Sequence, residues 1–106
     1  MITKSKLDCS IPIEDSSPLK GNVDLPRNKV YTLVIDYPLD NPAKFQIKTG
    51  IKGMSSIQVI DKIIKSYHKV YEQNIHGVWG HDIGDLMLVT VYVDHKKKLI
   101  TLDVDS

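Results

Sequence analysis

The sequence predicts an α+β domain, in which a four-stranded antiparallel sheet carries one amphipathic helix on one face, in the chain order ββαββ. Four segments of strand length are rich in β-branched and aromatic residues, and they form two pairs separated by a longer segment. That longer segment repeats its apolar residues at steps of three and four, as a half-buried helix does. The chain has 106 residues, 42% of them hydrophobic and 25% charged, which are the size and composition of one globular domain.

The first 29 residues differ from the rest of the chain. Pro12, Pro18 and Pro26 interrupt a segment rich in Ser, Asp and Lys, and its apolar residues occur singly. We find no period of 2 or 3.6 residues there. The composition therefore predicts an N-terminal arm over 1–29, extended or disordered, followed by a single domain over 30–106.

The first pair of strands is predicted at 30–37 and 43–49, separated by a turn that contains Pro38 and Pro42. Residues 30–37 place apolar side chains on both faces, which is typical of a central strand. In residues 43–49, Phe45 and Ile47 share one face. The opposite face carries Lys44, Gln46 and Lys48. This second strand is expected at an edge, protected by its lysines.

A helix is predicted from about Ser55 to Gln73. Ser55 and Gln58 have the spacing of a capping box, and Asp61 with Lys65 forms an i,i+4 pair in the favourable order. The apolar face consists of Ile57, Ile60, Ile63, Ile64, Tyr67, Val70 and Tyr71.

The second pair of strands is predicted at 86–93 and 98–104. Residues 86–93 are again apolar on both faces, so this strand should lie beside 30–37 at the centre. Numbered along the chain, the strands should follow the spatial order 2-1-3-4. The last strand would then be an edge that could accept an extended peptide by strand addition. The alternative is that Asp103 and Asp105 are a negatively charged guard of this edge.

One consequence of this arrangement concerns association. The helix covers one sheet face, while the central strands still present aliphatic side chains on the other. Each such side chain left in water forgoes roughly 1.5–3 kcal/mol of burial. We therefore expect either the arm or a second copy of the chain to cover this face. A homodimer is the expected assembly.

The loop over residues 75–86 is the expected functional surface. It holds the only Trp, two of the four His and three of the six Gly. A glycine-punctuated loop with an aromatic and titratable groups is where a small domain places a site. The expected partner-binding residues are Trp79, His76, His81 and Asp82, and the alternative for Trp79 is a core lid. The expected function is a small interaction or regulatory module that binds a protein partner or itself.

The rival hypothesis is an enzyme or a metal-dependent protein. His81 with Asp82 or Asp85 could act as an oriented general base. The same side chains together with His76 could ligate a divalent metal. The spacing matches no metal signature, and turn aspartates commonly bind turn amides instead. We therefore expect no cofactor and no resident metal, and we favour a non-enzymatic role.

Charge and cysteine content exclude some classes of function. The formal net charge is +1, and the basic residues are Lys apart from Arg27, so specific nucleic-acid recognition is not expected. Lysines at 62, 65 and 69 and at 96–98 are read as solvated surfaces. The single cysteine, Cys9, excludes an internal disulfide. With no apolar segment long enough for a membrane span or a signal peptide, we expect a soluble cytoplasmic protein without membrane contact.

Overall fold

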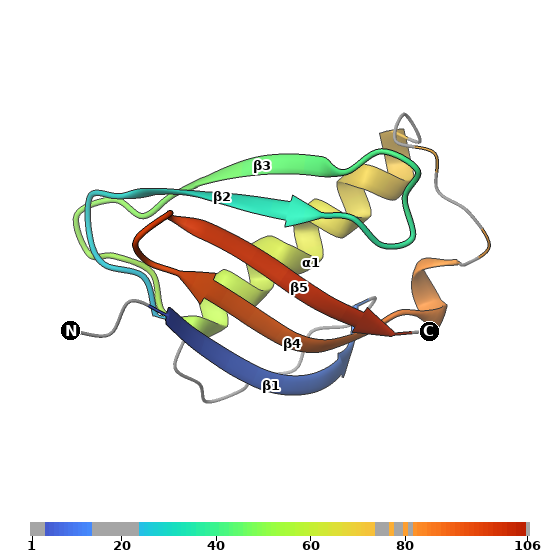
Figure 1. The fold of residues 1–106 in the computed structure, drawn as a ribbon, viewed down its shortest axis with the longest axis horizontal. Coiled ribbons are helices and arrows are strands. Elements are labelled where there is room, and N and C mark those ends of the chain that lie inside the picture. Colours follow the sequence, from blue (N-terminus) through green and yellow to red (C-terminus); the bar gives the residue numbers. More distant parts are fainter. Residues whose placement is uncertain (1–3, 14–23, 74–76, 78–79, 81, 106) are drawn as a thin grey trace.

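The computed structural model describes residues 4–13, 24–73, 77, 80 and 82–105. In chain order the elements are β1 (Lys4–Pro12), β2 (Val30–Ile35), β3 (Ala43–Lys48), α1 (Ser56–Gln73), a 3-10 turn η1 (Ile83–Asp85), β4 (Met87–Asp94) and β5 (Leu99–Asp105). The strands form one sheet, and α1 crosses behind it (Figure 1).

The sheet has five strands in the order β1-β4-β5-β2-β3. The predicted four-stranded antiparallel sheet in the order 2-1-3-4 is therefore wrong. The helix and both hairpins are found where they were predicted, and β3 does lie at an edge. However, the N-terminal segment contributes a further strand, and β5 rather than β4 lies beside β2, in parallel orientation. The sheet is consequently mixed.

β1 explains this reordering. It pairs antiparallel with β4 along the edge that the predicted order assigned to strand 30–37. Leu7 and Ile11 of β1 are buried on the helix side, so the strand contributes to the core as well as to the ladder. The pairing is interrupted between Asp8 and Ile11 by a bulge, with Ser10 at φ 50°.

A second irregularity accounts for the apolar pattern of β4. The register of β4 against β5 slips between Leu88 and Thr90. Leu88 faces the core before the slip, and Val91 and Val93 face it afterwards. The core-facing residues thus have even numbers before the slip and odd numbers after it. The run of apolar residues therefore reflects this change of phase.

The helix was predicted closely. The Ser55 N–H donates to Gln58 Oε1 at 2.9 Å and the Gln58 N–H donates to Ser55 Oγ at 3.4 Å, which confirms the capping box. The Asp61–Lys65 pair is also confirmed, at 2.8 Å. The buried face consists of Ser56, Val59, Ile60, Ile63, Ile64, Tyr67 and Val70. Ile57 was wrongly assigned to it, since its side chain is 51% exposed.

The sheet face away from α1 is mostly polar. Cross-strand neighbours Lys6 and Tyr92, and Asp8 and Thr90, share this face. Its clearest apolar residues are Val30 and Tyr92, which are 44% and 43% exposed. β1 lies in the plane of the sheet and not across this face (Figure 1).

Candidate functional site

The predicted site loop is only partly described. His76, Trp79 and His81 lie outside the described residues. Asp82 and Asp85 are both exposed. Asp82 precedes η1 and Asp85 is its last residue, and the Asp82 N–H donates to Asp85 Oδ2 at 3.3 Å. That carboxylate thus binds a turn amide, as expected for a turn aspartate. Within the described residues, no group of three or more His, Cys, Asp and Glu side chains is placed to hold a metal ion.

Gly77 ties this loop to the β2–β3 turn. Its carbonyl accepts the Asp40 N–H at 3.0 Å. Gly77 has φ 73°, and a Cβ at this position would lie 2.6 Å from Asp40 Oδ2. The left-handed backbone and the close contact both require glycine.

A different site lies at the opposite end of β4. It is a pocket of about 640 Å³, which we call the lysine pocket. The lining residues come from β1, from the segment that leads into β2, from β2 itself and from the β4–β5 turn. They are Lys4, Ser5, Lys6, Asp24, Pro26, Lys29, Tyr31, His95 and Lys98. This concave site combines four lysines with one acidic residue.

A chain of hydrogen bonds crosses the pocket wall. Tyr31 Oη lies 2.7 Å from His95 Nδ1, and His95 Nε2 lies 3.1 Å from Ser5 Oγ. The two rings meet edge-on, with centroids 5.8 Å apart. Tyr31 is only 1% exposed, and burial raises the pKa of its phenol. The contacts therefore join β1, β2 and the β4–β5 turn.

The direction of these hydrogen bonds decides what His95 can do. In the tautomer with the ring proton on Nε2, Tyr31 donates to Nδ1. Nε2 then donates to Ser5 Oγ. In this tautomer His95 has no lone pair directed at the Ser5 hydroxyl. In either tautomer the hydrogen bonds hold side chains of β1, β2 and the β4–β5 turn together at the pocket wall.

The one acidic residue of the pocket lining already accepts hydrogen bonds from α1. Asp24 Oδ1 accepts hydrogen bonds from the Ser56 N–H at 2.7 Å and from Ser56 Oγ at 2.8 Å, at the start of α1. Its charge thus faces the positive end of the helix dipole. The pocket lining therefore keeps an excess of positive charge, with four lysines to one carboxylate.

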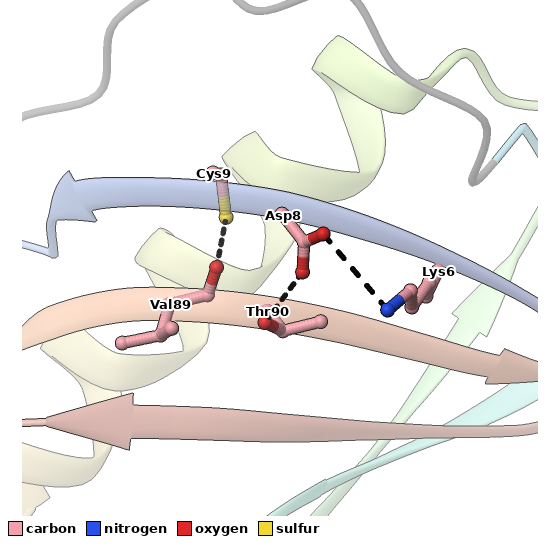
Figure 2. A network of polar contacts seen from close by, with 5 residues as sticks. All are labelled: Lys6, Asp8, Cys9, Val89 and Thr90. Atoms are coloured by element: carbon pink, nitrogen blue, oxygen red, sulfur yellow. Dashed lines mark hydrogen bonds and ion pairs between the residues drawn. The ribbon is translucent and has the colours of Figure 1, made fainter.

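One lysine of the pocket has a weak ion pair. Lys6 Nζ lies 4.0 Å from Asp8, and both side chains are largely exposed. Asp8 also accepts a hydrogen bond from Thr90 Oγ1 at 2.9 Å (Figure 2). An exposed pair of this length contributes little. Lys4, Lys29 and Lys98 form no ion pair with any residue that the structure describes.

Figure 2 also shows the side chain of Cys9 beside this network, directed at the backbone of β4. Its Sγ donates to the carbonyl oxygens of Leu88 and Val89 at 3.4 and 3.5 Å. Burial raises the pKa of the Cys9 thiol. A thiol with a raised pKa stays protonated at neutral pH and is a weaker nucleophile than a thiolate.

The β4–β5 turn holds Lys98 in place. Asp94 Oδ1 accepts the N–H groups of Lys96 and Lys97, both at 3.0 Å. The bond from Lys97 is the main cause that lowers the pKa of the Asp94 carboxyl. The carbonyl of Lys98 accepts the Thr32 N–H at 2.9 Å, and Lys98 itself has φ 53°. A lysine in this left-handed conformation costs about 1–2 kcal/mol relative to glycine.

Sequence reasoning missed this site. It identified the lysine run 96–98 but interpreted the run as a solvated turn. Ser5, Lys29 and Tyr31 drew no functional interpretation. No local motif could have found them, because the lining residues come from separate parts of the chain and meet only through the order of the strands.

No family model, curated protein or solved structure matches this chain. None of the helices in the described part of the chain has both the length and the apolar character needed to cross a membrane.

Proposed function

We propose that this protein is a binding module for a small phosphate-bearing ligand, which it holds in the lysine pocket. The observation that carries the proposal is the convergence of four lysines on a pocket of about 640 Å³ whose one acidic residue, Asp24, is hydrogen-bonded to the start of α1. Such a pocket attracts an anion. The proposal keeps the expected role of a small regulatory module and gives it a ligand class.

Phosphate suits this site better than a carboxylate. Lysine ammonium groups bind phosphate as point charges and need no planar fork. A dianion can interact with several of them at once. Two lining lysines have well-defined backbone positions: the Lys29 N–H donates to Thr49 Oγ1 at 2.9 Å, and the Lys98 carbonyl accepts from β2. The pocket is therefore partly preorganised.

Binding is favoured over catalysis if the ring proton of His95 lies on Nε2, because Nε2 then donates to Ser5 Oγ and does not accept its proton. A hydrolytic role for Ser5 would require the ring proton on Nδ1, with Tyr31 Oη as its acceptor. The alternative enzyme based on His81, Asp82 and Asp85 remains a prediction, as does the binding surface at Trp79.

The test is a titration of the full-length ¹⁵N-labelled protein with inorganic phosphate and pyrophosphate, followed by NMR at constant ionic strength. We expect amide shifts concentrated at Ser5, Lys29, His95 and Lys98. Replacing Lys29 and Lys98 by Gln should weaken binding by roughly tenfold, equivalent to about 1.4 kcal/mol. Raising the salt concentration should also weaken it, because exposed charges are screened within about 8 Å at physiological ionic strength.

The matched control is Lys44→Gln with Lys62→Gln, which removes the same charge from exposed sites on β3 and α1. This variant should bind pyrophosphate as the unmodified protein does. An equal loss in both double variants would show that only net charge matters. Shifts spread over the surface would likewise contradict the lysine pocket.

Self-association is a second proposal. It is supported by the exposure of Val30 and Tyr92 on the sheet face that α1 does not cover, at 44% and 43%. Light scattering on the full chain tests it, since a mass of one chain at all concentrations would exclude a homodimer.

A further inference from the structure

β5 is an inner strand over only part of its length. It pairs with β4 from Leu99 to Asp105. Its pairing with β2 comprises only Thr32 with Leu99 and Leu33 with Ile100. Beyond this point the two strands diverge, and α1 is visible between them (Figure 1). The second half of β5 is therefore a sheet edge, although the strand lies third in the order of five.

In the second half of β5, alternate residues direct their main-chain groups toward the side on which β2 no longer pairs. The Lys98 carbonyl accepts the Thr32 N–H, so it points to β2. Backbone groups alternate in direction along a strand. The N–H and C=O groups of Leu102 and Val104 therefore point to the same side as those of Ile100. β2 ends at Ile35, and no described strand pairs with Leu102 or Val104 on this side.

The side chains around this edge differ between the two faces. Leu102 and Val104 are half-buried and pack against the core. Thr101, Asp103 and Asp105 are exposed and alternate with them. Asp36, which follows β2, is also exposed. An added strand would thus meet apolar neighbours on the helix side and acidic neighbours on the other.

We infer that the second half of β5 binds an extended basic peptide by strand addition. The main-chain groups of Leu102 and Val104 would supply the hydrogen bonds. Apolar and acidic side chains alternate along this half of β5. This pattern favours a peptide in which aliphatic and basic residues alternate, with its lysines or arginines opposite Asp103. This surface is independent of the lysine pocket, which lies at the other end of β5.

The test uses the full chain and a synthetic peptide of about six residues, the length of an average strand, in which valine and lysine alternate. A peptide of valine and glutamate is the counterpart. Binding of the basic peptide should slow hydrogen exchange at the Leu102 and Val104 amides. Asp103→Lys should weaken the binding of the basic peptide at least about tenfold and strengthen the binding of the acidic peptide, because like charges across a ladder repel. Asp103→Asn should give an intermediate loss.

Glu72→Lys, an equal charge change on the exposed side of α1, is the matched control and should leave both affinities unchanged. Three results would overturn the inference. The first is full protection of the Leu102 and Val104 amides from hydrogen exchange in the absence of peptide. If this protection increases with protein concentration, a second copy of the chain covers the edge. The second is protection at β1 or β3 instead. The third is an Asp103→Lys protein that does not change its peptide preference.

Discussion

Lys98 combines an unfavourable backbone with a place in the candidate site. Its φ of 53° lies in the left-handed region, where glycine or asparagine is the usual residue. Asn28, at φ 56° next to Lys29, fits that preference, but Lys98 does not. Strained residues persist at functional sites when the side chain is needed. The left-handed conformation of Lys98 makes this residue a good place to test the proposed phosphate site.

The first prediction follows from this strain. Lys98→Gly should be as stable as the unmodified protein or up to about 1 kcal/mol more stable, because glycine adopts this conformation without a steric penalty. The same variant should bind pyrophosphate severalfold more weakly. Urea unfolding and the NMR titration measure the two effects. A loss of stability without a loss of binding would make Lys98 a structural residue.

At the level of single residues, the sequence predicts burial better than it predicts function. Periodicity predicts five of the buried positions of α1, namely Ile60, Ile63, Ile64, Tyr67 and Val70, but it does not include the buried Ser56 and Val59. Ile57 was misassigned because it lies in the first turn, at the border of the apolar face. The hydrogen bonds of His95 with Tyr31 and Ser5 depend on residues 64 and 90 positions away in the chain. No spacing rule could relate these side chains.

Among the elements, α1 is the main contributor to the core. Ile63 is fully buried, whereas Ile57 is 51% exposed. Ile63→Ala should therefore cost about 2–5 kcal/mol, as large-to-small core changes do. Ile57→Ala should change the free energy of unfolding by less than about 1 kcal/mol. Chemical denaturation of both variants tests the contrast, and equal losses would mean that the two side chains are equally buried.

The strands were harder to predict because two of them contain bulges. In β1, Leu7, Cys9 and Ile11 occupy alternate positions, which is a strand signal. The surrounding charges, Ser10 and Pro12 obscured it. In β4 the core-facing side of the strand changes between Leu88 and Val91. The sequence pattern therefore resembled that of a strand buried on both faces. A period-2 pattern is readable only where the ladder is regular.

At the scale of the whole molecule, one missed strand changed the topology. With β1 paired to β4, that edge of β4 is no longer available to β2, and β5 takes the place beside β2. The helix-free face is correspondingly less apolar than expected, so the argument that something must cover it is weaker. The same arrangement brings β1, β2 and the β4–β5 turn together to form the lysine pocket.

The last prediction concerns the N-terminal segment. A chain that begins at Asn28 would lose four buried side chains, Leu7, Ile11, Ile13 and Leu25. At roughly 1.5–3 kcal/mol each, their burial amounts to roughly 6–12 kcal/mol. The net stability of a typical domain is only about 5–15 kcal/mol.

The shortened chain would also expose the edge of β4 that β1 now covers, and open strand edges promote aggregation. We therefore expect the shortened chain to show no cooperative thermal unfolding when it is measured by circular dichroism. In light scattering it should form large species. Lys6→Ala, an exposed change on β1, is the control and should alter stability by less than about 0.5 kcal/mol. If the shortened chain stayed monomeric and as stable as the full chain, β1 would be dispensable for the fold. The lysine pocket would then lack a permanent wall, because Lys4, Ser5 and Lys6 all belong to β1.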